Sequence, residues 1–160
     1  MNKHAVLQLI LEKLSVDLDI AQRAAQTAYE TATHEENIAE NKYDTLGLEA
    51  SYLAAGQAKR VEEIKQSLTL CQNLQLRAYD DQRGIEVGAL LGLEDENGRQ
   101  QWLFLAPDAA GLKVEVVGQP VTVITPRSPL GNSLLGKFDG DEVEILVAGT
   151  RQHFTVTEAK

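Results

Sequence analysis

The chain has 160 residues, of which 43% are hydrophobic and only 5% aromatic, so we expect a mostly aliphatic core. Its 24 acidic residues outnumber 15 Lys and Arg, and the net charge of −9 disfavours binding of duplex DNA through phosphate neutralisation. The single cysteine, Cys71, excludes a disulfide framework or a zinc site of several thiolates, and residues 1–14 are too short an apolar run for a signal peptide or membrane span. We therefore expect a soluble, cytoplasmic protein.

The composition changes near residue 80. The first 80 residues contain no proline and two glycines, Gly47 and Gly56, whereas all four prolines and the other ten glycines occur from Gly84 onward. Because proline and glycine interrupt helices and β-branched residues favour strands, this change indicates helices followed by a sheet. We predict an α+β protein with a helical domain over 1–80, a linker around 79–84 and a small mixed domain over 84–160.

The first half has the heptad pattern of a coiled coil. Its first apolar seam consists of Leu7, Leu11, Leu14, Leu18, Ala21, Ala25, Ala28 and Ala32, and its second of Ala54, Gln57, Val61, Ile64, Leu68 and Cys71. The first seam changes from leucine to alanine along the chain and the second changes from alanine to larger residues, so an antiparallel hairpin matches their sizes. Residues 41–47 are polar and predict the turn. At ~1.5 Å per residue, arms of about 35 residues make the hairpin about 50 Å long, with a slim alanine-rich end.

Acidic residues gather where this hairpin turns. Residues 30–49 contain six acidic residues and one lysine. One interpretation is a solvated helix end, with Asp44 or Thr45 capping the second helix. The other is that carboxylates converge at the tip, around 36–49, and offer the hard oxygen ligands that Mg²⁺ prefers. The candidates for such a cation are Glu36, Glu40, Asp44 and Glu49.

The second half contains short β-branched or alternating runs that predict strands. These runs are 85–93, 101–105, 112–117, 121–125, 142–147 and 153–157, and Asn97-Gly98 predicts a hairpin turn. One short helix is expected over 128–136, with Ser128 as its N-cap, Pro129 as its first residue and Gly136 at its C-terminal end. Residues 137–141 then form a turn into the strand that follows.

Residues 125–145, TPRSPLGNSLLGKFDGDEVEI, form a signature segment that resembles the C-terminal signature of the bacterial GreA/GreB transcript-cleavage factors. The resemblance implies an N-terminal antiparallel coiled coil and a C-terminal domain of FKBP-like fold. It also implies a non-enzymatic, monomeric transcription elongation factor that binds bacterial RNA polymerase, with indirect contact to nascent RNA or DNA and no membrane. The predicted polymerase-binding residues lie in the signature segment: Ser128, Pro129, Leu130, Gly136, Lys137, Asp139 and Asp141.

In that family the coiled coil enters the secondary channel of the polymerase, and its acidic tip helps to hold the second Mg²⁺ of the active site while the polymerase cleaves a backtracked transcript. The resemblance therefore implies a protein with no cofactor or pre-bound metal of its own, which shares the Mg²⁺ of the polymerase active site. When residues 49–55 are aligned on Tyr52 with the family's tip motif, the two acidic positions fall on Thr45 and Leu48, one residue away from Asp44 and Glu49.

This departure leaves two functions open: stimulation of transcript cleavage, or inhibition of transcription by occupying the channel. A third reading is a peptidyl-prolyl isomerase, which rests on fold analogy alone. Isomerases of that fold use an aromatic pocket, for which this half offers Trp102, Phe104, Phe138 and Phe154.

Other residues have structural explanations. Cys71 falls on the second seam and reads as a small core residue, and the three histidines lie too far apart in sequence for a metal site or a catalytic triad. Gly56 lies inside the second helix, where glycine costs about 1 kcal/mol relative to alanine. We expect close helix packing to require it.

Overall fold

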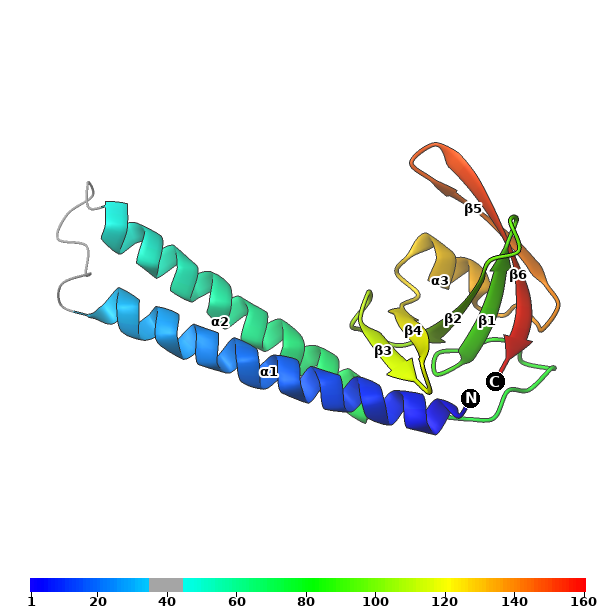
Figure 1. The fold of residues 1–160 in the computed structure, drawn as a ribbon, viewed down its shortest axis with the longest axis horizontal. Helices are drawn as coiled ribbons and strands as arrows, with labels where there is room; N and C mark the ends of the chain where they lie inside the picture. The colour runs from blue at the N-terminus through cyan, green and yellow to red at the C-terminus, as the bar shows by residue number, and fades with distance from the viewer. Residues whose placement is uncertain (35–44) are drawn as a thin grey trace. The chain divides into compact units, whose positions relative to one another are not determined.

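The computed structural model describes residues 1–34 and 45–160 and, of Leu46, the backbone alone. Two long helices, α1 (Lys3–Thr33) and α2 (Thr45–Gln72), precede a domain of strands and one short helix (Figure 1). The chain forms two compact units, Lys13–Leu68 and the combination of Met1–Glu12 with Thr69–Lys160. The first unit is the main part of the helical hairpin. The second contains the start of α1, the last residues of α2 and the sheet. The predicted α+β fold class is confirmed.

In the unit Lys13–Leu68 the two helices lie side by side and run in opposite directions (Figure 1). Both predicted seams are confirmed, because none of their side chains is exposed. The buried members are Leu14, Ala21, Ala28, Val61, Ile64 and Cys71, and the others are half-buried. The hairpin is therefore held by an aliphatic seam that narrows to alanine toward its far end.

The expectation for Gly56 was wrong. It lies exposed on α2, and a Cβ atom built on it would meet no atom within 4 Å. Close packing therefore does not require glycine at this position.

The second unit contains one six-stranded sheet with the order β3-β4-β2-β1-β6-β5. Strands β2 and β4 are parallel, and all other neighbours are antiparallel. The elements are β1 (Leu90–Asp95), β2 (Gln100–Leu105), β3 (Lys113–Val116), β4 (Gln119–Ile124), α3 (Pro129–Leu134), β5 (Glu142–Val147) and β6 (Thr150–Ala159). The likeness of this unit to an FKBP-like domain stays a prediction.

The first strand begins later than predicted, at Leu90 instead of residue 85. Residues 85–89 make their backbone hydrogen bonds elsewhere: Ile85 N donates to Lys137 O at 2.7 Å and Gly88 N to Leu105 O at 2.7 Å. The Asn97-Gly98 turn joins β1 to β2 as expected, and the Asp95 carboxylate accepts bonds from the amides of Asn97 and Arg99, both at 2.9 Å.

One face of the sheet packs against α3. Leu91 and Leu93 of β1 and Val143 of β5 belong to a cluster that includes Leu134 of α3, and Leu130 packs against it. This cluster holds the short helix, and with it the signature segment, on the sheet. Among the described residues, no helix combines the length and apolarity needed to cross a membrane.

Candidate functional site

The signature segment enters α3 through a well-defined N-cap. Ser128 has an extended backbone (φ −83°, ψ 154°), its Oγ accepts a bond from Gly131 N at 3.0 Å, and it donates to Thr125 O at 2.9 Å. Pro129 follows at the first helical turn, where its missing N–H costs no hydrogen bond. A Cβ atom on Gly131 would lie 1.9 Å from Thr125 O, so the helix approaches the preceding turn too closely for any other residue.

The segment leaves α3 through Gly136, whose φ of 77° is the left-handed conformation that ends many helices. The Gly136 amide donates to Ile85 O at 2.8 Å, and Lys137 O accepts from the Ile85 amide at 2.7 Å. Gly84 lies directly beside Gly136 and Lys137, since a Cβ atom built on Gly84 would be 2.8 Å from the carbonyl oxygen of each. The chain that connects α2 to β1 is thus hydrogen-bonded to the end of α3.

The turn after α3 is closed by Asp141. Its Oδ2 accepts from the Phe138 amide at 2.9 Å, and its own amide donates to Phe138 O at 2.9 Å. The Asp139 amide donates to the hydroxyl oxygen of Tyr79 at 3.1 Å. The carboxylate of Asp141 therefore shapes the turn.

The seven predicted polymerase-binding residues thus divide into two groups. Ser128, Gly136 and Asp141 form caps and the turn, and Leu130 packs on the core; the side chains of Pro129, Lys137 and Asp139 are exposed. The sequence reasoning missed two further exposed side chains of this segment, Leu135 and Phe138, each 37% exposed. Two apolar residues in a short polar turn are the signal that could have indicated them. Contact of any of these residues with a polymerase stays a prediction.

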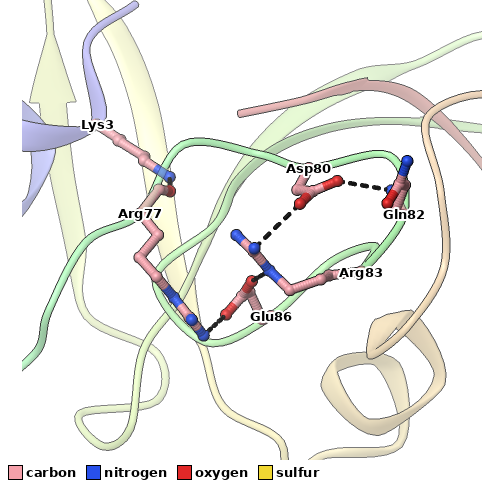
Figure 2. A network of polar contacts seen from close by, with 6 residues as sticks. All are labelled: Lys3, Arg77, Asp80, Gln82, Arg83 and Glu86. Atoms are coloured by element: carbon pink, nitrogen blue, oxygen red, sulfur yellow. Dashed lines mark hydrogen bonds and ion pairs between the residues drawn. The ribbon is translucent and has the colours of Figure 1, made fainter.

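The connecting chain carries a network of ion pairs, the connector network, shown in Figure 2. Glu86 accepts from Arg83 Nε at 3.0 Å and pairs with Arg77, and Arg83 Nη1 lies 3.0 Å from Asp80 Oδ2. Lys3 donates to the carbonyl of Arg77. The hydrogen bond from Arg83, with further help from Arg77, lowers the pKa of Glu86, while burial lowers that of Lys3. The network fixes the connector where Ile85 meets the end of α3.

Of the four carboxylates predicted at the tip of the hairpin, the structure describes one. Glu49 is exposed on α2, whereas Glu36, Glu40 and Asp44 lie outside the described residues. Thr45 is exposed at the first position of α2, and Leu48 is half-buried. Within residues 1–34 and 45–160, no three His, Cys, Asp or Glu side chains lie close enough together to hold a metal ion. An exposed glutamate is a donor of the type that Mg²⁺ accepts, so the chemistry of Glu49 fits the predicted role.

The four aromatic residues considered for an isomerase pocket do not share one environment. Phe104 is fully buried and Phe154 belongs to the core cluster, whereas Trp102 is half-buried and Phe138 is exposed in the turn after α3. Two of the four are thus part of the interior.

No protein-family model matches the chain, and no curated protein does. Among solved structures, the chain is similar to GreA factor homolog 1 of Thermus thermophilus, with 20% identity over 94% of each chain and a TM-score of 0.38. It is also similar to Gfh1 of Thermus aquaticus, with 22% identity over 92% of each chain and a TM-score of 0.38. A transcription elongation factor GreA/GreB from Nitrosomonas europaea has 18% identity over 64% of this chain and 91% of its own, with a TM-score of 0.37.

Proposed function

We propose that this protein is a Gre-type transcription elongation factor that binds bacterial RNA polymerase through its sheet domain and inserts the helical hairpin into the secondary channel. The observation that carries the proposal is the signature segment, which resembles the Gre signature and presents Pro129, Lys137 and Asp139 to solvent on a domain that follows a long hairpin. The protein acts as a cytoplasmic monomer, contacts nucleic acid only indirectly within the elongation complex, and is not itself an enzyme.

The shape of the hairpin supports insertion into a narrow channel. Helix α1 has 31 residues, which correspond to about 46 Å at ~1.5 Å per residue. Toward the far end its seam consists of alanines, with Ala28 buried and Ala25 and Ala32 half-buried. Because alanine side chains are small, the seam itself adds little bulk at this end of the hairpin.

The preferred activity is stimulation of the polymerase's own transcript cleavage. Glu49, together with Asp44, Glu40 and Glu36, would offer carboxylate oxygens to the second Mg²⁺ of the polymerase active site. That ion activates the attacking water and stabilises the charge of the leaving oxygen. The residues of this chain supply the ligands and the reach, and the polymerase supplies the catalytic site.

A second candidate, inhibition by occupation of the channel, is favoured by the region around Leu48. This half-buried apolar side chain and Thr45 occupy the positions where the family has its acidic pair. Neither can bind a cation as a carboxylate does. A hairpin that fills the channel without completing the metal site would block nucleotide addition.

A backtracked polymerase complex with Mg²⁺ distinguishes these functions. Cleavage stimulation predicts shortening of the transcript that is lost with Glu49→Ala or Asp44→Ala. Glu63→Ala, which removes an exposed carboxylate elsewhere on α2, is the matched control and is expected to keep the activity. Binding with slowed nucleotide addition and no shortening would establish the inhibitor. Absence of binding to the polymerase would overturn both.

A further inference from the structure

Asp108 contacts both the end of α2, which belongs to the hairpin, and the start of the signature segment. Its carboxylate forms an ion pair with Arg127, 19 residues further along, directly before the N-cap of α3. Its backbone amide donates a hydrogen bond to the sulfur of Cys71, in the last turn of α2. One residue of the β2–β3 loop thus contacts both the end of α2 and the start of the signature segment.

The two partners of Asp108 differ in their exposure to solvent. The Asp108 side chain is 19% exposed and that of Arg127 is 70% exposed, while Cys71 is fully buried. The loop is also tied to β4, because Ala106 N donates to Ile124 O at 2.8 Å and Gly111 N to Val123 O at 2.9 Å. The hydrogen bonds of the loop therefore fix the position of Asp108, and the Arg127 side chain that pairs with it lies mostly exposed to solvent.

The ion pair acts on the residues that form the N-cap. Thr125 is 2% exposed, and its carbonyl oxygen accepts from the Ser128 amide at 3.1 Å and from the Ser128 hydroxyl at 2.9 Å. Arg127 lies between these two residues, so its side chain restrains the turn that sets the direction of α3. Loss of the restraint frees this turn without removing any residue of the helix.

We propose that Asp108 is a positioning residue that couples the last turn of α2 to the first turn of α3 through Cys71 on one side and Arg127 on the other. The consequence for binding rests on the proposed function, because it takes α3 and its following turn as the surface that meets the polymerase. The coupling itself is a property of the free protein. It links the last turn of α2 and the start of α3 through one residue, and all three segments lie within the unit that contains the sheet.

Amide hydrogen exchange on the full-length protein tests the coupling directly. Asp108→Asn keeps the backbone amide and removes the charge, and Arg127→Gln removes the other member of the pair. Each is expected to speed exchange about fivefold in α3 and also in residues 69–73, a change in the range of measured couplings between sites. Arg127→Lys, which keeps the cation, should stay near the wild type. Arg151→Gln is the matched control, since Arg151 is 80% exposed and pairs with Glu144 at 3.4 Å.

Faster exchange confined to α3 in both variants would overturn the coupling, and so would unchanged exchange in both segments. Circular dichroism melting shows that each variant is folded at the temperature of the measurement. These outcomes do not depend on any partner.

Polymerase binding gives a second arm in the form of a double-mutant cycle. If Asp108 positions Arg127, the two single variants weaken binding by a similar factor, about fivefold, and the double variant weakens it no further. If Arg127 contacts the polymerase independently, Arg127→Gln weakens binding and Asp108→Asn does not, which would refute the positioning role. A wild-type protein that fails to bind would instead refute the proposed function, and the exchange experiment would still decide the coupling.

Discussion

The amide of Asp139 donates a hydrogen bond to the hydroxyl oxygen of Tyr79 at 3.1 Å, although the two residues lie 60 positions apart. Tyr79 belongs to the connector, and Asp139 to the turn after α3. Together with the paired bonds between Ile85 and residues 136–137, this contact joins the connector and the signature segment. The surface proposed to meet the polymerase is therefore fixed by the chain that leaves the hairpin.

Replacement of Tyr79 by phenylalanine removes this hydrogen bond and little else. We expect Tyr79→Phe to lower the free energy of unfolding by about 1 kcal/mol, the usual net contribution of one hydrogen bond. Urea denaturation followed by the fluorescence of Trp102, the single tryptophan, reports on the sheet domain. Tyr29→Phe is the control, because Tyr29 is 60% exposed on α1. Equal loss of stability in both variants would contradict the prediction.

Gly131 is the position least tolerant of a side chain. In Gly131→Ala the new Cβ would lie 1.9 Å from the carbonyl oxygen of Thr125, so backbone has to move and the N-cap at Ser128 opens. We expect a loss of about 3 kcal/mol or more in the free energy of unfolding, measured by the same fluorescence titration. A loss below about 0.5 kcal/mol would mean that α3 shifts freely, against its packing on the core.

Gly56 is expected to behave in the opposite way. It lies in the middle of α2 on a solvent-exposed face, and a Cβ atom there would meet open space. Gly56→Ala therefore gains helix propensity without a clash. We expect the hairpin to become more stable by about 0.5–1 kcal/mol. Thermal melting followed by circular dichroism at a helix-sensitive wavelength measures the change. A less stable variant would show that glycine has a role at this position outside helix packing.

Cys71 makes stability depend on alkaline pH. Burial, with a smaller effect from the charge of Asp108, raises the pKa of the thiol from 9.0 to about 11. Because the folded state holds this proton more tightly than the unfolded chain, its contribution to stability is complete below pH 9 and is lost as pH rises through 11.

The check is the difference in unfolding free energy between the wild type and Cys71→Ala, measured from pH 8 upward. We expect this difference to be constant up to about pH 9. Toward pH 11 the wild type should then lose stability relative to the variant. Other groups titrate in this range in both proteins, so they cancel in the difference. A difference independent of pH would contradict the raised pKa.

Rules that act between residues close in sequence, namely heptad spacing, helix capping and turn preferences, correctly predicted several elements of this fold. The seams of α1 and α2 follow from heptad spacing, and the cap at Ser128 with Pro129 after it follows from the chemistry of helix N-termini. The Asn97-Gly98 turn follows from the preference of glycine for positive φ, which is 79° at Gly98. The segment 85–89 was misassigned, because its apolar residues read as a strand while its hydrogen bonds go to Lys137 and Leu105.

The candidate site was predictable only in part. The sequence indicated the signature segment, but it did not distinguish side chains that form the turn, such as Asp141, from exposed ones, such as Lys137. Phe138 and Leu135 were missed because exposure of an apolar residue depends on which segments pack over it. Gly56 and Gly131 look alike in sequence, since both lie inside helical runs, and their tolerances to a side chain are opposite.

The order of the parts follows from the sequence: a hairpin of two amphipathic helices comes first, then a sheet domain with one capped short helix. Spacing, size and capping chemistry act between residues close in the chain, so they can be read from it. The contacts between distant positions became known only from the folded chain: Tyr79 with Asp139, Ile85 with the end of α3, and Asp108 with both Cys71 and Arg127. The physical reason is that these contacts depend on where the sheet brings distant segments together, which no local pattern encodes.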